Sequence, residues 1–160
     1  MRTVERTALA GLALLFLSAC TFVAAPPARN DAAIRSEVTA LVQRWSDAGE
    51  AGDWDAVADT YADAEGFAWI EQGEVRYGDH AAILEGLAQA RENNARIVND
   101  VSDIVVTPLS AGAAAYHASY TLTVSAEQFS FTSSGVVSGV AVLHEGRWRF
   151  LQGAFSERRQ

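Results

Sequence analysis

The chain has 160 residues, of which 49% are hydrophobic and 20% charged, and only three are prolines. This composition is typical of one globular domain and argues against a disordered or membrane-spanning chain. The formal net charge of −8 excludes the basic surface that a phosphate backbone requires, so we expect no nucleic-acid partner.

The first twenty residues follow the pattern of a bacterial export signal. Arg2 and Arg6 give a basic start, an apolar run covers 8–17, and small residues lead to Cys20. The apolar run is too short to cross a bilayer as a helix. Cys20 is the single cysteine of the chain.

The end of this leader, Leu17-Ser18-Ala19-Cys20, resembles the lipobox of bacterial lipoproteins. The resemblance implies that Cys20 carries lipid and holds the protein to a membrane on the periplasmic side. Thr21 stands where enteric lipoproteins of the inner membrane carry aspartate, which favours the outer membrane. We therefore expect a signal peptide at 1–19, and the lipidated cysteine with a proline-containing tether at 20–30.

A lipid on the single cysteine also limits the chemistry of the mature chain. With that thiol modified, we expect no disulfide, no cysteine nucleophile and no thiolate metal site. The three histidines are not spaced like metal ligands, so we expect no metal and no cofactor.

Two helical patterns follow the tether. Apolar residues recur at helical spacing from Ile34 to Trp45, which predicts a helix that Asp31 caps and Gly49 ends. Asp53 is a good N-cap for a second helix.

A hairpin and a third helix come next. Residues 67–70 and 74–77 flank the turn Gln72-Gly73, which predicts two paired strands. Asp79 then caps a third helix.

The remainder is rich in β-forming residues. Four runs at 97–109, 113–125, 129–143 and 147–155 are separated by turn residues, which predicts an antiparallel meander. Ser133-Ser134-Gly135 predicts a bulge inside the third run.

The second of these runs has one apolar and one polar side. Tyr116 and Tyr120 belong to the apolar side, which we expect to face the core. The polar side consists of His117, Ser119, Thr121 and Thr123. Because the helices come first and the meander follows, we predict an α+β domain over 31–156, with a tail at 157–160. Its three N-terminal helices should pack on a strongly curved antiparallel sheet.

The order of these elements resembles the nuclear transport factor 2-like (SnoaL-like) superfamily. The resemblance is carried by Gly52-Asp53-Trp54-Asp55-Ala56-Val57, Tyr61-Ala62-Asp63-Ala64, Gly73 through Gly78-Asp79, and Gly146-Arg147-Trp148-Arg149-Phe150. It implies a cone-shaped fold with an open-ended apolar cavity. Because its members include isomerases, dehydratases, cyclases, binding proteins and dimerising scaffolds, the fold by itself does not give the function.

The catalytic positions of this superfamily are altered. Laid over the pattern of the steroid isomerases, the chain has Trp45 in place of the oxyanion-stabilising tyrosine and Trp69 in place of the proton-shuttling aspartate. An indole cannot abstract a proton, which argues against that isomerase chemistry. Many members of the superfamily carry a His-x-His-x-Ser pattern in the last strand. In this chain only its serine, Ser156, is retained.

Candidate site residues fall into two groups. Weak candidates for acid–base catalysis are His117, Glu71 and Asp103, each of which also fits a solvated surface position. For a ligand-binding wall we expect Trp45, Trp69, Tyr116 and Tyr120, because the first two occupy catalytic positions of the superfamily and tyrosine adds a polar tip.

Three functions remain open at this point. The first is a membrane-anchored lipoprotein whose cone binds a small apolar or aromatic molecule without catalysis. The second is an interaction module that forms a homodimer through the polar outer face of the sheet. The third is a lyase or isomerase that uses non-standard residues such as His117, Glu71 or Asp103.

Overall fold

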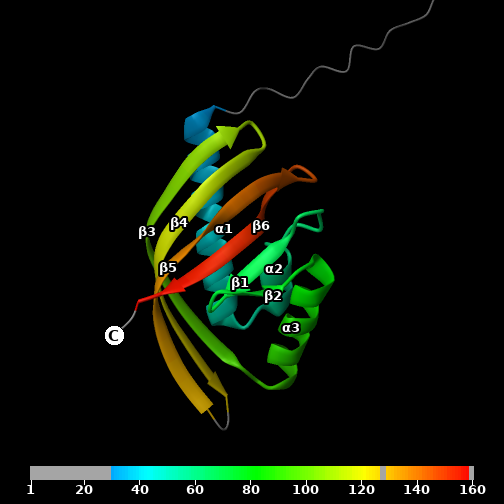
Figure 1. Cartoon of the computed structure of the whole chain (residues 1–160), viewed down its shortest axis with the longest axis vertical. Coiled ribbons are helices and arrows are strands. Elements are labelled where there is room, and N and C mark those ends of the chain that lie inside the picture. The colour runs from blue at the N-terminus through cyan, green and yellow to red at the C-terminus, as the bar shows by residue number, and fades with distance from the viewer. Residues whose placement is uncertain (1–29, 127–128, 159–160) are drawn as a thin grey trace, which may run out of the picture.

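The computed structural model describes residues 30–126 and 129–158. These residues form three helices and six strands, with the strands joined in one curved sheet (Figure 1). The expected signal peptide, Cys20 and the tether up to residue 29 lie outside the described residues, as do the last two residues of the expected tail. Within the described part of the chain, no helix has the length and apolar character needed to cross a membrane.

Helix α1 (Asp31–Ala51) runs across one face of the sheet (Figure 1). Its N-cap is Asn30, whose side chain accepts a hydrogen bond from the Ala33 amide at 2.8 Å, and not Asp31 as expected. Asn30 has the extended backbone that an N-cap requires, whereas Asp31 is already helical. The helix also continues past Gly49 and ends at Gly52, whose φ of 69° is the left-handed conformation of a helix C-cap.

The next four elements follow the predicted order. Helix α2 (Trp54–Ala58) is short, and the hairpin of β1 (Ala68–Glu71) and β2 (Glu74–Tyr77) leads to α3 (His80–Glu92). The caps are those predicted from the sequence. The Asp53 carboxylate accepts a hydrogen bond from the Ala56 amide, and that of Asp79 accepts one from the Ala82 amide.

Four long strands make up most of the sheet. They are β3 (Arg96–Ser110), β4 (Ala113–Ala126), β5 (Phe129–His144) and β6 (Arg147–Glu157), and they form the predicted antiparallel meander. The full order is β2-β1-β6-β5-β4-β3. One pair departs from the prediction, because β1 lies parallel to β6 and makes the sheet mixed. Short connections in the sequence predict only antiparallel neighbours, and β1 and β6 are joined by no such connection.

The predicted bulge at Ser133-Ser134-Gly135 is wrong. This stretch of β5 pairs with β4 residue by residue, and the register shifts lie elsewhere, for example between Ser102 and Val105 of β3. Gly135 serves a different purpose, because a Cβ there would lie 2.0 Å from the carbonyl oxygen of Ser156 on β6. The glycine therefore allows close strand approach and not a bend.

The core lies between the helices and the concave part of the sheet. We call its tightly filled region the packed end; it is formed by Ile34, Val38, Leu41, Val42 and Phe150, all at most 1% exposed. The predicted alternation of β4 is confirmed, since its Tyr116, Ala118 and Tyr120 are buried while His117 and Thr121 are exposed. The predicted α+β class and the cone-like arrangement of helices on a curved sheet are likewise confirmed.

Candidate functional site

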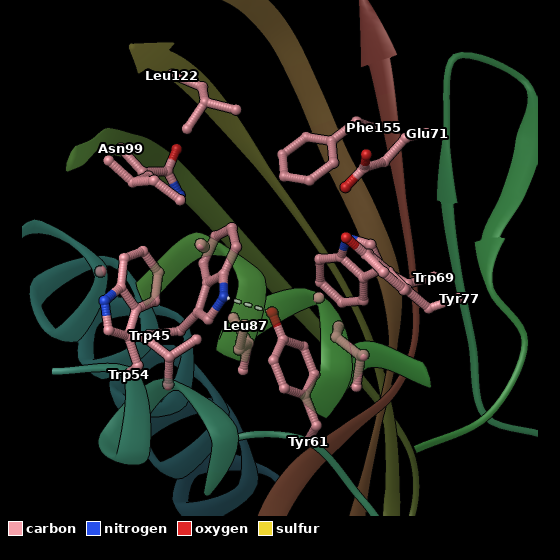
Figure 2. A pocket seen from close by; sticks show the side chains of 16 residues that line it. Trp45, Trp54, Tyr61, Trp69, Glu71, Tyr77, Leu87, Asn99, Leu122 and Phe155 are labelled. Atoms are coloured by element: carbon pink, nitrogen blue, oxygen red, sulfur yellow. Dashed lines mark hydrogen bonds between the residues drawn. The ribbon is translucent and has the colours of Figure 1, made fainter. Parts of the chain in front are cut away.

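A cavity of about 150 Å³ lies beyond the packed end, where the last turns of α1, α2, α3 and the hairpin face the sheet (Figure 2). We call this region the cavity end. Six aromatic side chains line it: Trp45, Trp54, Tyr61, Trp69, Tyr77 and Phe155. Because they come from α1, α2, the segment after α2, β1, β2 and β6, the tertiary fold is needed to bring them together.

Contacts between the aromatic rings fix the shape of the wall. The ring of Trp69 lies 5.9 Å from that of Trp45 and 5.2 Å from that of Tyr61, both within the range of favourable aromatic pairs. The indole N–H of Trp45 donates a hydrogen bond of 2.9 Å to the Tyr61 hydroxyl (Figure 2). Trp45 and Trp69, both predicted for the wall, therefore lie side by side in it.

Two glycines make room for these rings. A Cβ on Gly153 of β6 would lie 2.2 Å from the ring of Trp69, and one on Gly86 of α3 would lie 2.7 Å from the ring of Tyr77. Such contacts are too close for real side chains, so the aromatic wall depends on the absence of a side chain at both positions.

Asn99 on β3 is the buried polar residue of the cavity. Its side chain is 4% exposed, and its Oδ1 has no hydrogen-bond partner among the described residues. The amide end points from β3 towards the aromatic rings (Figure 2), while the backbone oxygen of Asn99 accepts a hydrogen bond from Ser46. Sequence reasoning missed this residue. The available signal was its place between Ile97 and Val101, with which it shares one face of β3.

Glu71 is the acidic group of the cavity. It ends β1, lines the cavity with Tyr61 and Tyr77, and points its carboxyl group towards the rings (Figure 2). Burial raises the pKa of Glu71, and the positive charge of Arg76 on β2 opposes that rise. Burial also raises the pKa of the Tyr61 phenol, so this hydroxyl loses its proton even less readily than that of an ordinary tyrosine.

The other acid–base candidates lie outside the cavity. His117 is exposed on the outer side of β4, opposite Val105 of β3. Asp103 is exposed on β3, where its carboxylate accepts a hydrogen bond of 3.2 Å from Ser119 Oγ. Of the three candidates, the structure brings only Glu71 to the cavity.

Tyr116 and Tyr120 face inward but do not line the cavity. Tyr116 packs on Phe150 with 5.0 Å between ring centroids, and its hydroxyl donates a bond of 3.4 Å to the Gln152 carbonyl oxygen. Tyr120 packs on Phe155 at 4.8 Å, and its hydroxyl pairs with that of Ser133. Strand alternation gives the face of a residue but not its position along the cone, which is why these two were expected in the wall.

Comparisons with known proteins agree with this architecture. The chain is similar to a proposed aromatic-ring hydroxylase from Novosphingobium aromaticivorans at 16% identity, with a TM-score of 0.72 over 82% of this chain and 94% of that one. A nuclear transport factor 2-like protein from Salmonella enterica is 12% identical, with a TM-score of 0.69 over 82% and 95% of the two chains. A proposed scytalone dehydratase, also from N. aromaticivorans, is 11% identical, with a TM-score of 0.68 over 78% and 83%.

At these identities the likeness shows the fold alone, and no curated protein matches the sequence. Stronger evidence comes from the family model of the SnoaL-like domain, which matches residues 30–152. This range contains almost the whole of the fold described above. The chain therefore belongs to the SnoaL-like family, with the nuclear transport factor 2-like fold.

Proposed function

We propose that the domain binds a small apolar or aromatic molecule in the cavity end. The observation that carries this proposal is a space walled by aromatic rings in which the buried Asn99 oxygen has no partner among residues 30–126 and 129–158. Buried polar atoms in native proteins are nearly always paired, so a missing partner calls for an explanation. A bound molecule with a hydrogen-bond donor supplies one.

The size and chemistry of the cavity support a ligand of about one ring. A volume of about 150 Å³ is comparable to that of an apolar cavity known to admit benzene. Trp45 and Trp69 stand at the positions that the superfamily resemblance assigns to a catalytic tyrosine and aspartate. Indole rings there offer contact area and not proton transfer, which favours binding over isomerase chemistry.

Native and denaturing mass spectrometry of the purified full chain tests this proposal. We expect a small mass that accompanies the folded protein and is lost on unfolding. Where no ligand survives purification, benzene and toluene serve as one-ring probes, read by the fluorescence of Trp45, Trp54 and Trp69, three of the four tryptophans of the chain.

Two variants of α3 provide a matched control. Ala90 lines the cavity and Ala88 is exposed on the same helix. Ala90→Phe fills the space and should abolish binding, whereas Ala88→Phe adds the same group to the surface and should leave binding unchanged. Binding that is equal in both variants, or absent from the wild type with every probe, would contradict the proposal.

An enzyme is the second candidate, because Glu71 places a carboxyl group in the cavity. Burial raises its pKa towards the range in which a general base works near neutral pH. A lyase or isomerase would use Glu71 to remove a proton next to a carbonyl group. The test is deuterium uptake by enolisable aryl ketones in D₂O, measured by mass spectrometry. Uptake with the wild type but not with Glu71→Gln favours catalysis, and equal rates exclude this role.

We also propose that Cys20 anchors the protein by a lipid on the periplasmic side of a membrane. The support is the leader pattern that ends in Leu17-Ser18-Ala19-Cys20. In a bacterial host, we expect the wild type in the membrane fraction, with an N-terminal peptide carrying acyl mass. Cys20→Ser should remove that mass and move the chain out of the membrane fraction, and an unchanged distribution would argue against the anchor.

A further inference from the structure

The cavity end has a charge of one sign. Among the described residues that line it, Glu71 is the only one with a charged side chain, and no arginine, lysine or histidine takes part. A guanidinium group that acts on Glu71 belongs to Arg76, which is exposed on β2 and lies over the ring of Tyr77 at 5.7 Å. An anionic ligand would therefore meet a carboxylate and find no cation within the lining.

The aromatic rings of the wall also favour a positively charged ligand. Ring faces carry partial negative charge and attract cations, with tryptophan the strongest, and desolvation increases the attraction. Three tryptophans, two tyrosines and a phenylalanine surround this space, which is the composition of sites that bind organic ammonium groups.

Asn99 adds a hydrogen-bond acceptor on the other side of the rings. Glu71 belongs to β1 and Asn99 to β3, and Figure 2 shows them on opposite sides of the aromatic group. A ligand body between them has the carboxylate at one end and an amide oxygen without a partner at the other. Both groups accept hydrogen bonds from a donor.

We propose that the ligand is a protonated amine carried on a small ring, with its ammonium group at the Glu71 carboxylate and its ring within the aromatic wall. A donor at the far end of the ring, such as a hydroxyl group, reaches Asn99. This inference rests on the proposed binding function and adds the charge and polarity of the ligand. The acidic net charge of the chain, −8, further favours the approach of cations.

Three probes that share a phenyl ring on a two-carbon chain differ in the charge of their polar group. Phenethylamine is cationic, 2-phenylethanol is neutral and 3-phenylpropionate is anionic near pH 7. We expect affinity to fall in that order, with the amine bound about tenfold more tightly than the alcohol, since a charge-assisted contact contributes roughly 1–2 kcal/mol. Tryptophan fluorescence or calorimetry gives the dissociation constants.

Variants test whether Glu71 causes the preference for the amine over the alcohol. Glu71→Gln should remove the advantage of the amine over the alcohol, and thermal unfolding shows that the variant is folded. Glu74→Gln is the matched control, because Glu74 is exposed on β2 and does not line this cavity. Adding a para-hydroxyl group, as in tyramine, should improve amine binding to the wild type but not to Asn99→Leu.

The outcomes distinguish this inference from the function on which it rests. Equal affinity for amine and alcohol, or an amine preference that survives Glu71→Gln, overturns the inference and leaves the binding function in place. Failure of all three probes and of toluene to bind overturns both. Preference for the anion would require a cation in the lining and would also overturn it.

Discussion

The packed end and the cavity end share helix α1 but differ in how completely their side chains fill the space. At the packed end, Ile34, Val38 and Leu41 are at most 1% exposed, and the nearby Trp148 indole donates a bond of 2.6 Å to Glu37. About one turn beyond Leu41 on α1, Trp45 is only partly buried, and the Asn99 oxygen has no partner within the described part of the chain. At the cavity end, incomplete packing and an unpaired buried oxygen therefore occur together, and such local inconsistency is expected at functional sites.

The largest contrast is expected from removing leucine side chains at the two ends. Leu41→Ala at the packed end should lower the free energy of unfolding by about 2–5 kcal/mol, because the surrounding side chains cannot fill the space. Leu122→Ala, where the side chain lines an existing cavity, should lower it by only about 1 kcal/mol. Urea unfolding measures both. Equal losses would mean that the two ends are packed alike.

The aromatic wall can be disturbed through a single methyl group. Gly153→Ala places a Cβ 2.2 Å from the ring of Trp69, so the ring or β6 must move, at a cost of about 1–3 kcal/mol and with loss of ligand binding. Gly112→Ala is the control, since its Cβ would meet Leu143 at an ordinary 3.8 Å. We expect the control to stay within about 0.5 kcal/mol of the wild type. Normal probe binding by Gly153→Ala would contradict the assigned role of Trp69.

Removing a polar group should have opposite effects on the stability of the folded protein at the two ends. Asn99→Leu removes a buried oxygen that has no partner in the described structure and should stabilise the unliganded protein by about 1–3 kcal/mol. Trp148→Phe removes an indole N–H that is hydrogen-bonded to Glu37 and should destabilise it by about 1 kcal/mol. Thermal unfolding without ligand compares them. A loss of stability in Asn99→Leu would show that the amide is satisfied in the free protein.

Glu71 should give the cavity end a dependence on pH. Burial raises the pKa of Glu71 in the folded state above its ordinary 4.5, so the folded chain holds this proton more tightly than the unfolded chain. The stability associated with the protonated carboxyl is complete below 4.5 and is lost as the pH rises through the raised value. Glu71→Gln should thus be more stable than the wild type at high pH, with the difference shrinking as the pH falls. A constant difference across the titration would contradict this expectation.

The smallest effects are expected on the outer face of the sheet. Thr121 and His117 are exposed there, near Val105 and Val136, which are 45% and 41% exposed. Thr121→Arg and His117→Ala should each change the free energy of unfolding by less than about 0.5 kcal/mol and leave ligand affinity unchanged. The homodimer predicted through this face remains a prediction. Sedimentation velocity tests it, because Thr121→Arg should separate such a dimer.

The sequence predicted the elements better than it predicted the site. Caps at Asp53 and Asp79 and the alternation of β4 are local signals, and each is confirmed. The parallel pairing of β1 with β6 joins residues far apart in the chain, and no local pattern encodes it. For the same reason, Trp45 and Trp69 could be assigned to the wall by resemblance, whereas the depth of Tyr116 could not. Asn99 was missed because the alternation that it shares with Ile97 and Val101 predicts which face it lies on but not that its oxygen reaches a cavity.

The position of β6 also has a consequence for the order in which this protein folds. Of the six described strands, the one that is synthesised last, β6, lies in the middle of the sheet, with β1 on one side and β5 on the other. Until residues 152–154 are available, residues 68–70 have no neighbour except their own hairpin. Contacts over such sequence separations form slowly because a long loop must close first. A chain that lacks its last ten residues should therefore hold neither the hairpin nor the aromatic wall in place, although every cavity residue except Phe155 would still be present.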